Sequence, residues 1–184
     1  RNLEKAGQLV QGFKKTTANA TRTEWLNLNL RSLLDSLLVS LSPVMKRAQC
    51  TVNLDCPPGL HLYTEPGSVS QALTNLMINA TVHAFDNIEA RRIDIKVTDL
   101  GAEVLITVAD NGNGMSEQAA VKAFTPFFTT KRTLGGSGLG LFSSRRVVEQ
   151  VLGGRMGFDT HKGRGTVFLI HLPKRRIGAV LENA

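Results

Sequence analysis

The chain has 184 residues, of which 42% are hydrophobic, and its 22 Lys and Arg outnumber its 15 Asp and Glu, giving a net charge of +7. This length and composition predict one globular domain with an extra element and exclude wholesale disorder. No apolar run approaches the roughly 20 residues of a membrane span, and the start lacks a signal-peptide pattern. Because residue 1 is not Met, we expect a fragment whose parent protein could be anchored in the inner membrane elsewhere.

The basic charge and the two cysteines bear on partners and compartment. Basic residues are scattered in pairs and one triplet, and only 5% of residues are aromatic, so no stacking surface for bases accompanies them. We therefore expect no nucleic-acid partner and no membrane contact by this chain. Cys50 and Cys56, in one extended segment, would lie about 20 Å apart, too far for a disulfide. With no zinc-type Cys/His cluster, this favours a reducing, cytoplasmic compartment.

The first twenty residues predict a helix. Apolar side chains recur there at spacings of three and four, the pattern of a coiled-coil seam; they are Leu3, Ala6, Val10 and Phe13. A polar linker follows at 16–23. The helix could pack on the domain behind it or serve in oligomerisation, and a seam that ends at a linker favours oligomerisation.

Hydrophobic periodicity predicts the elements that follow the linker. Predicted helices cover 30–46, a segment that begins at Pro66 or Ser68, and 139–152. Predicted strands cover 24–28, 51–54, 60–63, 93–97, 104–108, 155–159 and 166–172. Residues 111–138 have no periodicity and predict a long functional loop. The pattern is of the α+β class: a two-layer α/β sandwich whose mixed, mostly antiparallel sheet carries helices on one face, plus the N-terminal helix.

Three polar residues share a spacing of four on the second predicted helix. Asn75, Asn79 and His83 would form one polar stripe opposite an apolar face. An Asn carbonyl oxygen is a hard ligand suited to Mg²⁺. Taken alone, the stripe more often marks a solvated face or a buried amide network.

Two glycine-rich segments carry the other candidate groups. Asp110 ends a predicted strand before Gly112 and Gly114, so its carboxylate could accept a hydrogen bond from a base amine; an ordinary Asx turn is the alternative. The glycines of 135–141 lead into a predicted helix, and free N–H groups at its start would form a phosphate cradle. A flexible hinge is the alternative. In the loop between them, Lys131 and Arg132 could reach a triphosphate.

Five segments, in this order, resemble the nucleotide-binding boxes of the catalytic ATP-binding domain of bacterial two-component sensor histidine kinases. These segments are QALTNLMINATVH, DNGNG, FTPFFTTK, GGSGLGL and GRGT. The resemblance covers residues 23–173 and implies the Bergerat-type ATP-binding fold of the GHKL superfamily, which joins gyrase, chaperone, kinase and mismatch-repair ATPases. It also implies that residues 1–20 are the end of a dimerisation helix with the start of its linker, and that 174–184 form a basic tail.

The resemblance implies roles for the matching positions. Asp110 would bind the adenine amine, and Asn79 would coordinate Mg²⁺ bridging the phosphates, with Asn75 supporting the same site. Many relatives carry a phosphate-binding Lys where this chain has Val82, so we expect that charge from Lys131, with Arg132 second. The further implied nucleotide contacts are His83, Gly112, Gly114, Gly136, Ser137, Gly138, Leu139, Gly140 and Thr166.

The residue four positions before Asn79 separates reaction types. Superfamily members that hydrolyse ATP or phosphorylate serine carry Glu there, whereas this chain has Asn75. An amide cannot take a proton from water or serine, while a neutral imidazole needs no base. The resemblance thus implies phosphoryl transfer from MgATP to histidine, with an ATP hydrolase, a serine kinase or a non-catalytic docking module as alternatives.

The expected partners follow from the same resemblance. None of the four histidines lies on the opening helix, so we expect the acceptor upstream, on the protein's own dimerisation domain, within a homodimer. This chain alone is expected not to phosphorylate itself. The second implied partner is the receiver domain of a response regulator.

Overall fold

The structure is a computed structural model that describes residues 24–131 and 136–175. The helix expected at 1–20, the candidate Arg132 and residues 176–184 of the expected basic tail lie outside the described residues. Among the helices that are described, none has the length and apolarity needed to cross a membrane.

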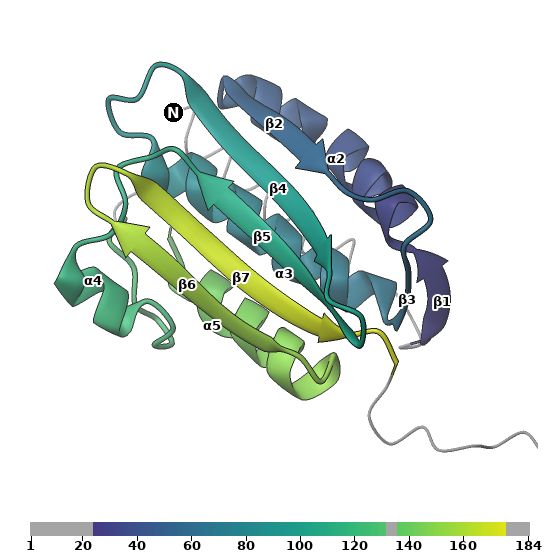
Figure 1. The fold of residues 1–184 in the computed structure, drawn as a ribbon. Coiled ribbons are helices and arrows are strands. Elements are labelled where there is room, and N and C mark those ends of the chain that lie inside the picture. Colours follow the sequence, from purple (N-terminus) through teal and green to yellow (C-terminus); the bar gives the residue numbers. More distant parts are fainter. Residues whose placement is uncertain (1–23, 132–135, 176–184) are drawn as a thin grey trace, which may run out of the picture.

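Five strands form the main sheet (Figure 1). In spatial order they are β2 (Cys50–Asp55), β4 (Arg91–Asp99), β5 (Glu103–Asp110), β7 (Gly165–Pro173) and β6 (Arg155–His161). Strand β2 pairs with β4 in parallel, and every other neighbouring pair is antiparallel. The predicted α+β class with a mixed, mostly antiparallel sheet is confirmed.

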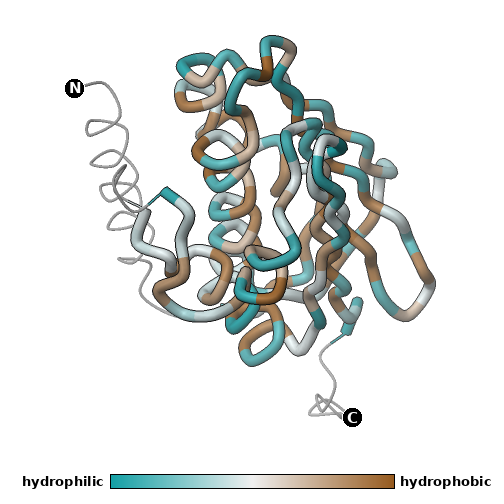
Figure 2. Tube along the Cα trace, turned by 90° about the vertical axis from the view of Figure 1, so that its left-hand side faces the viewer, coloured by the Kyte–Doolittle hydropathy of each residue, from teal (hydrophilic) through white to brown (hydrophobic). Residues whose placement is uncertain are grey.

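Helices α2 (Leu30–Arg47), α3 (Pro66–Asn79) and α5 (Gly140–Arg146) cover one face of this sheet (Figures 1 and 2). Alternate strand residues point at the helices and are buried, as Ile93, Ile95 and Ile106 are. They pack against the helix stripes in one continuous core, and each such side chain contributes about 1.5–3 kcal/mol by leaving water. The expected two-layer sandwich is confirmed.

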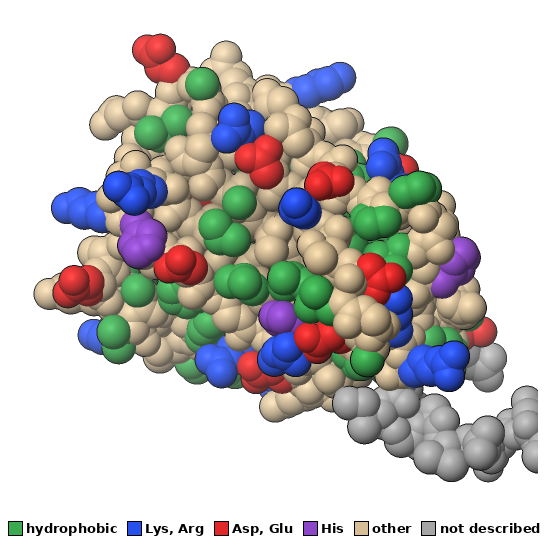
Figure 3. All heavy atoms as spheres, viewed as in Figure 1, with side chains coloured by type: hydrophobic (Ala, Val, Ile, Leu, Met, Phe, Trp, Pro, Cys, Tyr) green, Lys and Arg blue, Asp and Glu red, His purple; other side chains and the backbone are tan. Residues whose placement is uncertain are grey.

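The opposite face of the sheet is open and mixed in character. Figure 3 shows charged side chains of both signs around hydrophobic ones on this face. Arg155 of β6 donates to both carboxylate oxygens of Glu103 on β5, at 2.8 and 2.7 Å. These hydrogen bonds from Arg155 keep the pKa of Glu103 below its usual value. No candidate site residue lies in this cluster.

Two of the predicted strands form a separate small sheet. Strands β1 (Leu26–Asn29) and β3 (His61–Thr64) pair antiparallel with each other, outside the five-stranded sheet. The ring of Trp25 lies 5.7 Å from that of Tyr63 beside this pair. Their alternating sequences predicted strands but could not indicate which strands pair.

Two details of the helices were not settled by the sequence. Helix α4 (Glu117–Lys122) interrupts the expected loop of 111–138; Ser116 caps it by accepting the N–H of Ala119. Six residues are too few to establish a period, so the expected continuous loop was wrong. Helix α3 begins at Pro66, because the Glu65 carboxylate caps it by accepting the backbone N–H groups of Gly67 and Ser68; Ser68 is therefore not the cap.

The predicted helix of 139–152 consists of two parts. Helix α5 passes into a π-helical turn, η3 (Val147–Val151). The two cysteines are both buried and free, so the prediction that they form no disulfide is confirmed. Burial raises the pKa of the Cys50 thiol to about 11.

Candidate functional site

The helix that carries the polar stripe changes its geometry at Asn79. Helix α3 ends there, and a π-helical turn, η1 (Ala80–Ala84), follows directly. The wider turn shifts residues out of the α-helical spacing, and such insertions are frequent at functional sites. His83 lies in this turn, so the strict α-helical spacing of the predicted stripe extends from Asn75 to Asn79, and the place of His83 on the stripe stays a prediction.

Asp110 is the last residue of β5 and its carboxylate is held from one side. Its Oδ1 accepts the backbone N–H of Gly112 at 3.0 Å and that of Thr166 at 3.3 Å. Oδ2 accepts no hydrogen bond from the described residues, so that oxygen remains available to a ligand donor. Burial raises the pKa of Asp110 above its usual value, and the two N–H groups oppose that rise.

Thr166 supports Asp110 through its backbone. Its side chain is buried, and its Oγ1 lies 3.0 Å from Oγ1 of Thr160 on β6. In this structure the backbone N–H of Thr166 orients the Asp110 carboxylate. A contact of Thr166 with the base stays a prediction.

The first glycine segment packs directly on η1. A Cβ at Gly112 would collide with the carbonyl of Ala84, and Asn113 donates its N–H to that same carbonyl at 2.8 Å. Gly114 has φ +65° and lies against the carbonyl of His161, a position that favours glycine. These glycines thus allow two backbones to approach each other, and they join the end of β5 to the turn that follows Asn79.

The second glycine segment, residues 136–140, lies between Asn79 and the loop residues 127–131. A Cβ at Gly140, the first residue of α5, would lie 3.3 Å from both Oδ1 and Nδ2 of Asn79. Gly138, with φ +68°, lies against the backbone of Phe127, and Gly136 donates its N–H to the carbonyl of Lys131 at 3.2 Å. The predicted phosphate cradle, which also contains Ser137 and Leu139, is therefore next to the predicted metal ligand.

Lys131 is engaged by a carboxylate that the sequence did not single out. Its ammonium forms an ion pair with Asp86, just beyond η1. On the same segment, Oγ1 of Thr130 lies 3.2 Å from Nδ1 of His83. Burial and, to a smaller extent, the charge of Lys131 lower the pKa of His83, so the imidazole is neutral at pH 7. No periodic signal could have identified Asp86.

Asn75 faces α5 from inside the protein. It is 6% exposed, and its Nδ2 lies 3.2 Å from Oγ of Ser144 and 3.4 Å from the carbonyl oxygen of Gly140. The sequence did not identify Ser144 as a candidate residue. The feature that could have indicated it is a hydroxyl side chain on the buried face of a predicted helix, one turn after Gly140.

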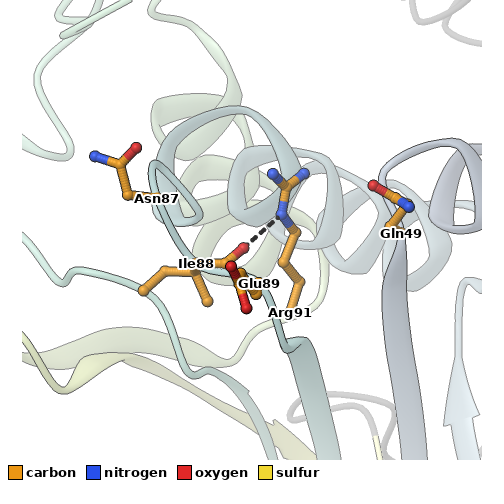
Figure 4. Close-up of a pocket in the computed structure, with 5 residues that line it drawn as sticks. All are labelled: Gln49, Asn87, Ile88, Glu89 and Arg91. Atoms are coloured by element: carbon orange, nitrogen blue, oxygen red, sulfur yellow. Dashed lines mark hydrogen bonds between the residues drawn. The ribbon is translucent and has the colours of Figure 1, made fainter.

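The loop before β4 borders a hollow of about 600 Å³. It is lined by Gln49, Asn87, Ile88, Glu89 and Arg91 (Figure 4), none of which is a predicted site residue. The Arg91 guanidinium donates to the carbonyls of Ile88 and Ala48, each at 3.0 Å. This arginine ties the loop before β4 to the end of α2, and we assign the hollow a structural origin.

The donor set limits how a metal could bind. The described residues contain no cluster of three or more His, Cys, Asp or Glu that could hold an ion. Asn79 offers a carboxamide oxygen beside Gly140, the last glycine of the cradle. Mg²⁺ commonly takes one or two protein oxygens and completes its shell with phosphate oxygens and water. The residues present therefore fit a magnesium ion that arrives with a polyphosphate.

Comparison with known proteins agrees with this geometry. Residues 64–176 match the family described as histidine kinase-, DNA gyrase B- and HSP90-like ATPase. The chain belongs to this family. The predicted resemblance to the catalytic ATP-binding domains of sensor histidine kinases is thereby confirmed.

Relatives of the chain include bacterial sensor proteins. It is 35% identical over 178 residues to the sensor protein GacS of Pseudomonas syringae pv. syringae, covering 91% of this chain and 19% of GacS. It is 32% identical over 179 residues to the C4-dicarboxylate transport sensor protein DctB of Pseudomonas aeruginosa, covering 93% of this chain and 29% of DctB. The chain thus spans less than a third of either relative.

Solved structures show the same fold. The nucleotide-free catalytic domain of histidine kinase ThkA superposes with a TM-score of 0.71 at 28% identity, covering 82% of this chain and 96% of that domain. ThkA in complex with the response regulator TrrA also gives 0.71, at 23% identity, covering 94% of this chain and 49% of that one. The family match and these likenesses confirm the fold class.

Proposed function

We propose that this domain binds MgATP and donates the γ-phosphoryl group to a histidine on an upstream dimerisation domain, as the catalytic part of a two-component sensor histidine kinase. One observation carries the proposal. Asp110, with Oδ1 held and Oδ2 available, is joined through Gly112 to the turn that follows Asn79. A base-reading carboxylate and a magnesium-type ligand therefore belong to one site built from distant segments of the chain.

Each part of the nucleotide has a matching group. Oδ2 of Asp110 accepts a hydrogen bond from the exocyclic amine of adenine, while N–H groups of the 136–140 segment that are not engaged within the protein bind phosphate oxygens. Asn79 would hold Mg²⁺, and the ion would supply positive charge beside the phosphates for a loose phosphoryl transfer. Lys131 takes the role of the phosphate-binding lysine that many relatives carry at the position of Val82. Its ammonium exchanges the ion pair with Asp86 for a phosphate oxygen.

The acceptor is inferred to be a histidine because the site has no carboxylate base at position 75. The amide of Asn75 directs its N–H groups at Gly140 and Ser144, and it cannot remove a proton from water or serine. A neutral imidazole attacks without such help. The ATPases within the family make ATP hydrolysis the second candidate, and Asn75 argues against it.

The proposed partners are a second copy of the full protein, through its dimerisation domain, and the receiver domain of a response regulator. The receiver domain is supported by ThkA, which has been solved together with the response regulator TrrA, and the second copy follows from the resemblance alone.

Calorimetry with MgATP tests the binding half of the proposal. The 184-residue chain should bind, and Asp110→Ala should bind at least tenfold more weakly, because it loses the acceptor for the adenine amine. Asp99→Ala, at the other end of the sheet and paired with Lys174, is the matched control and should bind normally. Equal binding by the Asp110 variant would remove the adenine contact from the proposal.

Labelled ATP tests the transfer half. When [γ-³²P]ATP is mixed with this chain and with the dimerisation domain of the parent protein, we expect acid-labile label on the dimerisation domain and none on this chain. Release of phosphate without labelled protein would instead identify an ATP hydrolase.

A further inference from the structure

A buried serine connects the two helices that border the proposed nucleotide site. Ser144 of α5 is 0% exposed. Its hydroxyl lies 3.0 Å from the carbonyl oxygen of Gly140, one turn earlier, and 3.2 Å from Nδ2 of Asn75 on α3. A more distant carbonyl, that of Ala72, lies at 3.5 Å. This is a polar cluster inside an otherwise apolar contact between α3 and α5.

Hydrogen-bond chemistry determines which groups of the cluster donate and which accept. A hydroxyl has a single hydrogen, and the shortest contact assigns it to the carbonyl of Gly140. Ser144 must then accept from Asn75, whose carboxamide N–H groups face both the hydroxyl and Gly140. The reverse amide orientation would set two acceptor oxygens 3.4 Å apart. A carboxylate at position 75 would meet the same carbonyl oxygen while buried, which is unfavourable.

The same glycine is placed by a second contact. A Cβ on Gly140 would lie 3.3 Å from the carboxamide of Asn79, one turn after Asn75. Helix α3 therefore meets the first residue of α5 twice, by the hydrogen bond from Asn75 and by close contact with Asn79, while Ser144 holds the same carbonyl from within α5. The distance between Asn79 and the glycine segment depends on both.

We propose that Asn75 and Ser144 are positioning residues that hold the glycine segment against Asn79 and so set the affinity for the triphosphate without touching the nucleotide. The inference rests on the proposed MgATP site. It separates two parts of that site, because Asp110, which reads the base, is held by β5 and β7 and has no hydrogen bond to this cluster among the described residues.

The test compares Ser144→Ala with the unaltered 184-residue chain by calorimetry with MgATP and by NMR titration with adenosine. Loss of one buried hydrogen bond should weaken MgATP binding about five- to tenfold, while adenosine affinity changes less than twofold. Ser40→Ala is the matched control. Its hydroxyl also donates to a carbonyl four residues earlier, at 3.0 Å, but on the exposed face of α2, and it should change neither affinity.

The double variant Asn75→Ala/Ser144→Ala adds a readout that general destabilisation would not give. Since the two side chains act through one carbonyl, their effects on MgATP affinity should be less than additive. Should Ser144→Ala not fold, Ser144→Cys replaces it with the same expected selectivity for the triphosphate. Equal losses for adenosine and MgATP, or no loss for either, would overturn the inference. Failure of the unaltered chain to bind either compound would instead remove the proposed function, and this inference with it.

Discussion

Thr166 donates its backbone N–H to Oδ1 of Asp110 at 3.3 Å, and the two residues face each other in the β5–β7 ladder. Gly112 donates to the same oxygen at 3.0 Å. The protein thereby fixes the plane of the carboxylate with one oxygen only. A base that binds here must present a donor to Oδ2, as the amino group of adenine does.

This arrangement predicts that Asp110→Asn changes the base preference. The Asn oxygen retains the two N–H partners, so its NH₂ group takes the place of Oδ2 and faces the adenine amine, donor against donor. Guanine carries an acceptor oxygen at the equivalent position. We expect MgATP affinity to fall about 10- to 100-fold, corresponding to about 1–3 kcal/mol, and the ratio of MgGTP to MgATP affinity to rise. Calorimetry with both nucleotides measures this.

Asp94→Asn is the control for this change, because Asp94 forms hydrogen bonds with Arg92 and Asn53 away from the candidate site. It should leave both affinities unaltered. An Asp110→Asn chain that keeps its preference for ATP would mean that Oδ2 does not contact the base.

A second prediction concerns Gly140→Ala. The new Cβ would lie 3.3 Å from the carboxamide of Asn79, closer than ordinary packing allows, so Asn79 must shift by a few tenths of an ångström. We expect MgATP affinity to fall several-fold, whereas stability should change by less than about 1 kcal/mol, because Gly140 is the first residue of α5 and the full preference for Ala over Gly applies to helix interiors. Thermal unfolding and calorimetry on one sample separate the two effects.

Gly157→Ala provides the comparison, because a Cβ there meets nothing within 4 Å. It should leave nucleotide affinity unchanged. A Gly140→Ala chain that binds MgATP normally would show that the position of the Asn79 carboxamide does not limit binding.

The sequence predicted the elements that have long, regular patterns. The leucines of α2 and the alternating β4–β5 hairpin left little choice of structure, and both were found close to their expected bounds. Helix α4 was missed because its six residues carry no period. The pairing of β1 with β3 was beyond reach, since alternation reveals a strand but not its neighbour.

For the site, motif order predicted which segments carry the candidate groups, but not their contacts. His83 lies in a π-helical turn rather than in the expected α-helix, and no local pattern in Ala80–Ala84 predicts such a turn. Asp86 and Ser144 form their contacts over 45 and 69 residues of sequence. Such partners depend on tertiary packing and could not be read from spacing.

A third prediction follows from the ion pair of Lys131 with Asp86. If Lys131 binds phosphate, as we propose, Asp86 competes with the nucleotide for that ammonium. Asp86→Asn should then strengthen MgATP binding about two- to fivefold, the value of a partly exposed ion pair of up to about 1 kcal/mol, and the gain should shrink at high salt. Calorimetry at two salt concentrations measures both. Asp35→Asn, which breaks the exposed pair with Arg31 on α2, is the control, and unchanged binding by Asp86→Asn would argue against Lys131 as a phosphate ligand.

The last prediction concerns pH. Burial and the nearby Lys131 lower the pKa of His83 below its usual 6.5, so the unfolded chain takes up this proton before the folded chain does. The free energy of unfolding should therefore decrease as the pH falls through 6.5 toward the folded-state pKa, by at most about 1.4 kcal/mol per pH unit for this group. Urea unfolding between pH 7.5 and 5.5 measures the slope, which His83→Gln should reduce and His61→Gln, at an exposed position of β3, should reduce less.

Bound MgATP should raise the pKa of His83 in an NMR titration, because phosphate near the ring favours its charged form. A pKa of 6.5 or above without nucleotide would contradict the packing of His83 against Thr130 and Lys131.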